Sequence, residues 1–181
     1  PGDGTEICDF HPSTINRYVK QLRSEEDTLL SHHVARTHNE LDMARYNAMA
    51  KNKWTLGELY TQRADLVHPT KRLFNNSYVV QFADAPAKTI IAHLYKDGNQ
   101  FIHPDAAQER TFTVREAARI QSFPDDFIFK GSRTQQFKQV GNAVPPLLAQ
   151  KVAEVLRTLI ENKLQDTQLA INFEGENTCS N

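Results

Sequence analysis

The chain has 181 residues, 39% of them hydrophobic, with 21 Lys and Arg against 22 Asp and Glu. This length allows one domain, or one small domain with appended helices. The near-neutral balance does not indicate a nucleic-acid partner, although residues 31–140 carry 15 basic and 11 acidic residues. Two cysteines in unlike contexts argue against a disulfide scaffold, and no signal peptide, membrane span or repeat is recognisable. The expected location is the cytoplasm.

The first 30 residues are expected to form an N-terminal helical lead-in. Apolar residues among many charges predict a helix over part of residues 13–30. Three histidines follow, His32, His33 and His38, and imidazole is a good metal ligand. No carboxylate or cysteine completes a recognisable pattern, so no metal site is expected.

Asn39 is suited to cap a helix from Glu40 to about Ala50, because a short polar side chain accepts a hydrogen bond from the first turn. Trp54 and Leu56 are expected to cover the end of this helix.

Short strands are predicted after Lys71. Apolar runs occupy residues 78–82, 89–94 and 100–103. The pair Asp97-Gly98 between the last two runs is a strong hairpin signal, because both positions tolerate positive φ. Together the runs predict a small twisted β-sheet.

A capping box predicts the next helix. Thr113 and Glu116 are three residues apart and can satisfy each other's backbone donors, so a helix should begin at Val114. It should run to about Ser122, because Pro124 lacks a backbone donor.

Two further helices are predicted. One covers residues 134–140 and should end at Gly141, since glycine readily takes the left-handed conformation. Pro145 and Pro146 suit the first turn of the other. Its apolar stripe needs a partner and consists of Leu148, Val152, Val155, Leu159 and Ile160. Beyond Leu164 the periodicity is lost, and a mobile tail over residues 165–181 is expected.

The stretch FTVREAARIQSFPDDFIFKGSRTQQFKQVGNAV, residues 112–144, resembles the last two motifs of DNA cytosine-5 methyltransferases. A weaker resemblance covers residues 31–159. It implies an α+β fold in which residues 31–111 form a small twisted β-sheet recognition domain with surrounding helices. Residues 112–164 would hold the C-terminal motifs and a long return helix. That helix would pack on an α/β, Rossmann-like catalytic domain that this chain lacks.

No catalytic residue is expected in this chain. The family's nucleophile is the Cys of a Pro-Cys pair, but Cys8 follows Ile7 and Cys179 follows Thr178. Nor does an apolar strand lead into a glycine-rich turn that could hold S-adenosylmethionine. The resemblance therefore implies the recognition and C-terminal part of a methyltransferase, inactive alone.

The resemblance also implies roles for single residues. Asn142 and Ala143 would lie beside the methionine end of S-adenosylmethionine. Arg115 and Glu116 would brace the recognition region, with Pro124 and Gly141 as structural motif positions. Thr89 would contact the DNA backbone near the flipped cytosine, although strand propensity explains this residue equally well.

Further DNA contacts are candidates on chemical grounds. Cationic side chains suit phosphates and neutral amides suit base edges. The phosphate candidates are Lys71, Arg72, Lys88, His93 and Lys96, and the base candidates are Asn75, Asn76, Gln81 and Gln100.

The expected partners are double-stranded DNA and a catalytic half of the methyltransferase. Without that half, self-association is expected through Leu148, Val152, Val155 and Leu159, because a large exposed apolar patch promotes association. Two alternatives stay open. The chain is the small subunit of a naturally split methyltransferase, or it is a non-catalytic, sequence-specific DNA-binding module. A truncated polypeptide explains the Pro-Gly-Asp start equally well.

Overall fold

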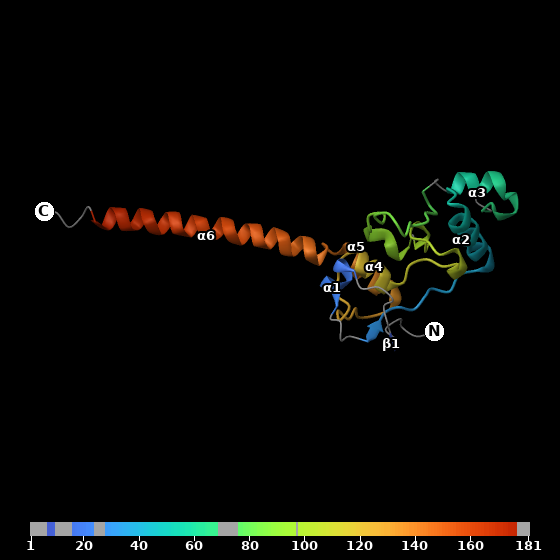
Figure 1. Ribbon diagram of the computed structural model, residues 1–181, viewed down its shortest axis with the longest axis horizontal. Helices are drawn as coiled ribbons and strands as arrows, with labels where there is room; N and C mark the ends of the chain where they lie inside the picture. The colour runs from blue at the N-terminus through green and yellow to red at the C-terminus, as the bar shows by residue number, and fades with distance from the viewer. Residues whose placement is uncertain (1–6, 10–15, 24–27, 69–75, 97, 177–181) are drawn as a thin grey trace. The chain divides into compact units, whose positions relative to one another are not determined.

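The computed structural model describes residues 7–9, 16–23, 28–68, 76–96 and 98–176, with side chains up to residue 165. The chain divides into two compact units, Pro1–Ala143 and Val144–Asn181. Helices dominate, and the described residues form one small two-stranded sheet (Figure 1). None of the described helices combines the length and apolarity needed to cross a membrane.

The first unit contains five α-helices, four short 3-10 helices and the sheet among its described residues. In chain order these elements are β1 (Ile7–Asp9), α1 (Arg17–Leu22), β2 (Leu29–Ser31), α2 (Glu40–Asn52), α3 (Leu56–Gln62), η1 (Ala64–Leu66), η2 (Ala92–Tyr95), η3 (Gly98–Gln100), η4 (Ala106–Gln108), α4 (Val114–Ile120) and α5 (Arg133–Asn142).

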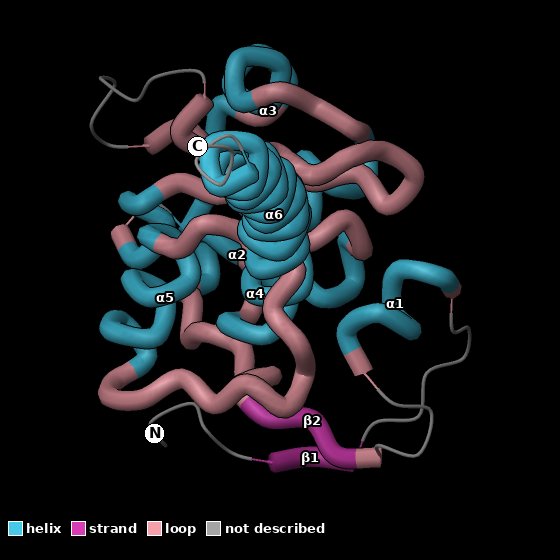
Figure 2. Tube along the Cα trace, turned by 90° about the vertical axis from the view of Figure 1, so that its left-hand side faces the viewer, coloured by secondary structure: helices cyan, strands magenta, loops and turns pink. Residues whose placement is uncertain are grey.

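The N-terminal segment contributes the sheet and α1. Strands β1 and β2 pair antiparallel, with Cys8 opposite Leu30 (Figure 2). Helix α1 confirms the helix expected within residues 13–30. It begins because the Asn16 side chain accepts a hydrogen bond from the Val19 backbone N–H at 2.9 Å.

Helix α2 confirms the predicted cap, because the Asn39 side chain accepts from the Asp42 N–H at 2.8 Å. The helix continues to Asn52, beyond the expected end at Ala50. Helix α3 was not predicted, although Thr55 and Glu58 form a capping box at its start. Helices α2 and α3 share one core cluster, in which Met49 and Leu59 are fully buried.

The predicted sheet over residues 78–103 is wrong for the described part of that segment. Only two isolated bridges occur there, Val80 with Ile102 and Ile102 with Thr111. Residues 92–95 and 98–100 instead form the 3-10 helices η2 and η3. The apolar residues of this segment join two buried clusters, one with Tyr78, Val80 and Ile102 and the other with Ile90, Leu94 and Phe101, so tertiary packing overrides their β-propensity.

The predicted hairpin at Asp97-Gly98 is also wrong. Asp97 lies outside the described residues, and Gly98 starts η3. A Cβ on Gly98 would lie 2.8 Å from the Arg36 Nη1 atom. The Arg36 guanidinium therefore lies against the Gly98 backbone, and a larger residue here would have to displace that side chain.

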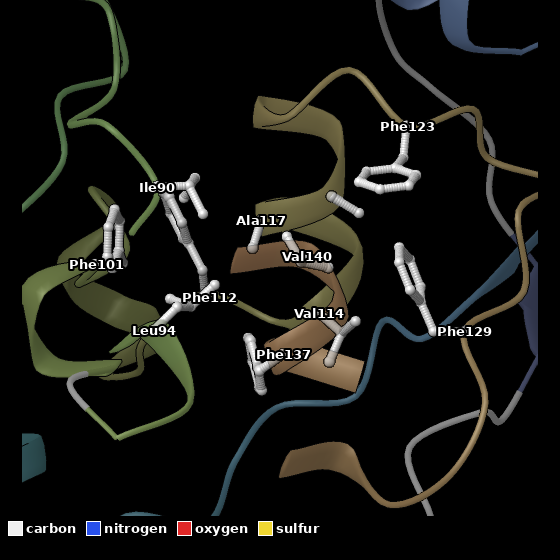
Figure 3. Close-up of a cluster of buried hydrophobic side chains, with 11 residues drawn as sticks. Ile90, Leu94, Phe101, Phe112, Val114, Ala117, Phe123, Phe129, Phe137 and Val140 are labelled. Carbon is white, nitrogen blue, oxygen red and sulfur yellow. The ribbon is translucent and has the colours of Figure 1, made fainter. Parts of the chain in front are cut away.

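Helices α4 and α5 form the main core with the segment around η2 (Figure 3). Helix α4 begins at Val114 as predicted, and the Thr113–Glu116 capping box is present. It ends at Ile120, and Ser122 follows with a positive φ of 61°. The cluster consists of Ile90, Leu94, Phe101, Phe112, Val114, Ala117, Ala118, Phe123, Phe129, Phe137 and Val140.

The second unit is helix α6 (Pro146–Glu176). It starts at the second of the two prolines, as predicted. Helical structure does not stop at Leu164 but continues to Glu176. Within the described residues of this unit, no second element covers the apolar side chains of α6.

Candidate functional site

Arg115 on α4 connects three separate segments of the first unit. Its guanidinium is fully buried and donates to the Ser31 carbonyl and hydroxyl oxygens, both at 3.0 Å. It also donates to the carbonyl oxygens of Pro124 at 2.9 Å and Phe127 at 2.8 Å. Burial lowers the pKa of Arg115 to about 10, and the nearby Asp125 carboxylate opposes this shift. The side chain is therefore charged at neutral pH.

Glu116 faces a different segment. The Arg110 guanidinium donates to both of its carboxylate oxygens, at 2.7 and 2.8 Å, and the Thr113 N–H donates to it at 2.8 Å. Burial alone would raise the pKa of Glu116, but the hydrogen bonds and charge of Arg110 hold it below the usual value. Arg115 and Glu116 thus bind neighbouring segments and not each other.

A second ion-pair network holds the turn after α4. The Arg119 guanidinium donates to both oxygens of the Asp125 carboxylate, at 2.9 and 2.7 Å. Arg23, just after α1, lies 3.4 Å from the same carboxylate. The turn that contains Pro124 is therefore held from α4 and from the end of α1.

The end of α5 differs from the prediction at Gly141. Gly141 lies inside α5, which ends one residue later at Asn142, and its φ is not positive. A Cβ at this position would lie 2.6 Å from the Ile91 carbonyl oxygen and 3.2 Å from the Ala92 Cα. Glycine is needed here for close approach between α5 and the backbone before η2, not for a left-handed turn.

The Asn142 side chain is exposed and makes no hydrogen bond within the described ranges. An amide offers two donors and a carbonyl acceptor, so it is available to a polar ligand. Ala143 is the C-cap of α5, partly buried against the main core. Asn142 and Ala143 thus form the C-terminal end of α5, directly after the glycine that packs against the Ile91 backbone.

Gln81 and Lys88 contact each other, although both were candidates for DNA contacts. Gln81 is only 4% exposed; its Oε1 accepts from the Lys88 backbone N–H at 2.8 Å, and its Nε2 donates to the Gln100 carbonyl at 2.9 Å. The Lys88 Nζ donates to the Gln100 Oε1 at 2.7 Å. The three residues close the base of the exposed loop 82–86.

The other candidates are spread over the surface. Thr89 and His93 are exposed, without a side-chain hydrogen bond in the described ranges, and they flank Ile91, the residue that Gly141 contacts. Asn76 is exposed and borders a cavity of about 300 Å³ that Trp54 and Tyr78 also line. Lys71, Arg72 and Asn75 lie outside the described residues. Thr89 and His93 therefore flank the backbone that contacts the end of α5, whereas the cavity beside Asn76 is lined by neither of them.

Sequence reasoning missed the role of the histidines. His32 is fully buried, and its Nε2 accepts from the Phe129 N–H at 3.1 Å. The His38 Nε2 accepts from the Thr111 N–H at 3.3 Å, and the His33 Nδ1 lies 3.2 Å from the Thr113 Oγ1. Among the described side chains, no group of three or more His, Cys, Asp and Glu could hold a metal. The histidines connect the segment after β2 to the region around α4.

We expect the free energy of unfolding to fall as the pH is lowered below about 6.5. Burial lowers the pKa of His33, His38 and His103 in the folded protein below the ordinary value of 6.5. The unfolded chain then binds more protons between the lowered and the ordinary pKa, so acid favours unfolding. Urea unfolding at several pH values from 7.5 to 5 measures this dependence. His38→Gln should make it shallower, and an unchanged dependence would contradict the assignment.

Comparison with known proteins agrees with this architecture. The sequence model of the family described as C-5 cytosine-specific DNA methylase matches residues 7–158. A type II methyltransferase of Bacillus paralicheniformis is 38% identical over 144 residues, which are 77% of this chain and 32% of that protein. A type II methyltransferase of Desulfomicrobium norvegicum is 35% identical over 173 residues, 89% of this chain and 40% of that protein.

The fold is shared with solved structures. One is a crystal structure of a candidate DNA modification methyltransferase encoded within a prophage of E. coli, with a TM-score of 0.58 and 19% identity. The match covers 87% of this chain and 41% of that one. The chain therefore spans well under half the length of the proteins it matches.

Proposed function

Since the chain belongs to the C-5 cytosine-specific DNA methylase family, we propose that it is the target-recognition and C-terminal part of a DNA cytosine-5 methyltransferase. The complete enzyme would transfer a methyl group from S-adenosylmethionine to C5 of cytosine in double-stranded DNA. The observation that carries the proposal is the contact between Gly141 and the Ile91 backbone. It joins the candidate DNA segment, with Thr89 and His93, to the helix end that presents Asn142.

The chemistry explains why this part is needed and why it is not sufficient. Cytosine C5 becomes nucleophilic only after a thiolate adds at C6. The chain contains no Pro-Cys pair, so the thiolate would come from a polypeptide segment outside it. Flipping the cytosine out of the duplex costs a few kcal/mol, which protein contacts to the DNA must offset. Such contacts are the proposed contribution of this chain.

The residues at the end of α5 fit a cofactor contact. The exposed Asn142 amide has no partner within the described part of the chain, so it is free to bind a polar group. When bound, S-adenosylmethionine supplies the methyl group. Asn142 would orient the cofactor, and the packing of α5 would keep the amide in place.

We expect the chain alone to bind no S-adenosylmethionine measurably and to methylate no DNA. A polypeptide that carries the family's Pro-Cys and glycine-rich segments should restore both activities. Calorimetric titration and methyl transfer to DNA, with and without that polypeptide, test the proposal. Micromolar cofactor binding by the chain alone would contradict it.

Lys88→Ala and Gln81→Met should both weaken DNA binding by the complete enzyme, for different reasons. Lys88 is a proposed phosphate contact, so its loss should reduce the slope of log affinity against log salt by about one. The Gln81 amide is bonded to protein backbone. Its loss should therefore weaken all DNA sequences similarly and leave the salt slope unchanged. Relaxed preference at one base pair in Gln81→Met would instead assign this residue to base reading.

A further inference from the structure

We infer that Gln121 is a positioning residue for the turn that carries Asn142, an inference that rests on the proposed function. Gln121 is the C-cap of α4 and is 8% exposed. Its side-chain Nε2 donates to the Val140 carbonyl at 3.1 Å and to the Ala143 carbonyl at 3.3 Å. These two carbonyls lie on either side of Gly141 and Asn142.

The chemistry of the contact suits a glutamine. The last carbonyls of a helix have no partner within that helix. Both acceptors here are carbonyl oxygens, and the NH₂ group of an amide fits them with one proton for each. The backbone alternative is poor, because the Ala143 N–H reaches the Val140 carbonyl only at 3.4 Å. Gln121, at the end of α4, therefore caps the C-terminal end of α5 with two hydrogen bonds.

The turn is held on its other side as well. Gly141 lies directly against the Ile91 carbonyl, which leaves α5 no room to move toward that backbone. Asn142 itself contributes no side-chain hydrogen bond within the described ranges. Its position is thus set by Gln121 and by the Gly141 contact, while its amide stays available to a ligand. Such preorganisation lowers the entropic cost of binding.

Gln136 provides a matched control. It is also buried, and its Nε2 donates to the Gly131 carbonyl at 2.8 Å, near the other end of α5. Gln136→Met removes the same chemical group from a buried position on α5, where its contacts are with Gly131 and His32 and not with the Asn142 turn. Gln121→Met removes the two donors that hold that turn and keeps a side chain of similar length.

The first measurement is amide hydrogen exchange on the full chain. Gln121→Met should speed exchange of the Gly141 and Asn142 amides by roughly 2- to 10-fold relative to Gln136→Met, the factor expected for one net hydrogen bond. Equal exchange at these amides in the two variants would overturn the inference, whatever the cofactor does.

The second measurement is the KM for S-adenosylmethionine in the active methyltransferase that contains this chain. Gln121→Met should raise KM roughly 2- to 10-fold with a smaller change in kcat, and Gln136→Met should leave KM unchanged. A KM that rises in Asn142→Ala but not in Gln121→Met would overturn the inference. An unchanged KM in Asn142→Ala would instead overturn the proposed cofactor role of the turn.

Discussion

Replacing Arg115 by methionine is expected to lower the free energy of unfolding by about 3–5 kcal/mol. The guanidinium donates to four oxygen atoms of Ser31, Pro124 and Phe127, all at 3.0 Å or less. Methionine has similar length but no donor, so buried or partly buried acceptors lose their partners. Each such loss is more costly than the net value of the bond, because the acceptor stays desolvated.

Two further variants separate this effect from a general loss of charge. Arg115→Lys keeps the charge, but one ammonium group cannot reach acceptors on both sides of a planar fork, so an intermediate loss is expected. Arg63 has a comparable fork on Asp65, but its side chain is 47% exposed. Arg63→Met should therefore change little. Urea unfolding followed by Trp54 fluorescence compares the three. An Arg115→Met protein as stable as Arg63→Met would show that the hydrogen bonds contribute nothing.

Local sequence signals predicted the helix starts well. The Asn39 cap and the Thr113–Glu116 capping box depend on residues within one turn, and both are present. The helix ends were harder to predict. Lys53 and Ser122 take the left-handed conformation after α2 and α4, where the expected residue type is glycine. Lysine and serine do not indicate this conformation by residue type, so the sequence does not mark these helix ends.

The strands predicted after Lys71 were wrong because long-range packing decides the structure of that segment. Its apolar runs fit strands by composition, but Ile90, Leu94 and Phe101 all point into one cluster with α4 and α5 (Figure 3). Contacts with α5, about 40 residues later in the chain, decide this geometry.

Long-range contacts in the candidate site were also not predictable from local sequence patterns. The resemblance identified Asn142 and Arg115 as important positions, but it did not indicate what holds them. Gln121 reaches a carbonyl 19 residues away, and Gln81 bonds to Gln100 at the same separation. No local pattern marks a side-chain amide that bonds to distant backbone, so only the structure reveals these contacts.

Gly141→Ala is expected to destabilise the first unit by about 1–3 kcal/mol, as for an overpacked core. The new Cβ would lie 2.6 Å from the Ile91 carbonyl oxygen and 3.3 Å from that of Ala92, both backbone atoms that cannot move alone. In an open helix position the same change stabilises by roughly 0.4–1 kcal/mol. Gly57 in α3 is such a position, with no atom within 4 Å of a Cβ, so Gly57→Ala should stabilise.

Gly141→Asn distinguishes close approach from a left-handed helix stop. Asparagine tolerates the left-handed conformation, so a helix-stop position would accept it with little loss. A position that needs close approach would reject it more strongly than alanine, because the side chain is larger. Thermal unfolding of the three variants against wild type makes the comparison. If Gly141→Asn were as stable as wild type, the contact with Ile91 would not constrain α5. If Gly141→Asn is the least stable variant, α5 is fixed against the segment that carries Thr89 and His93. A shift of α5 would then also shift that segment.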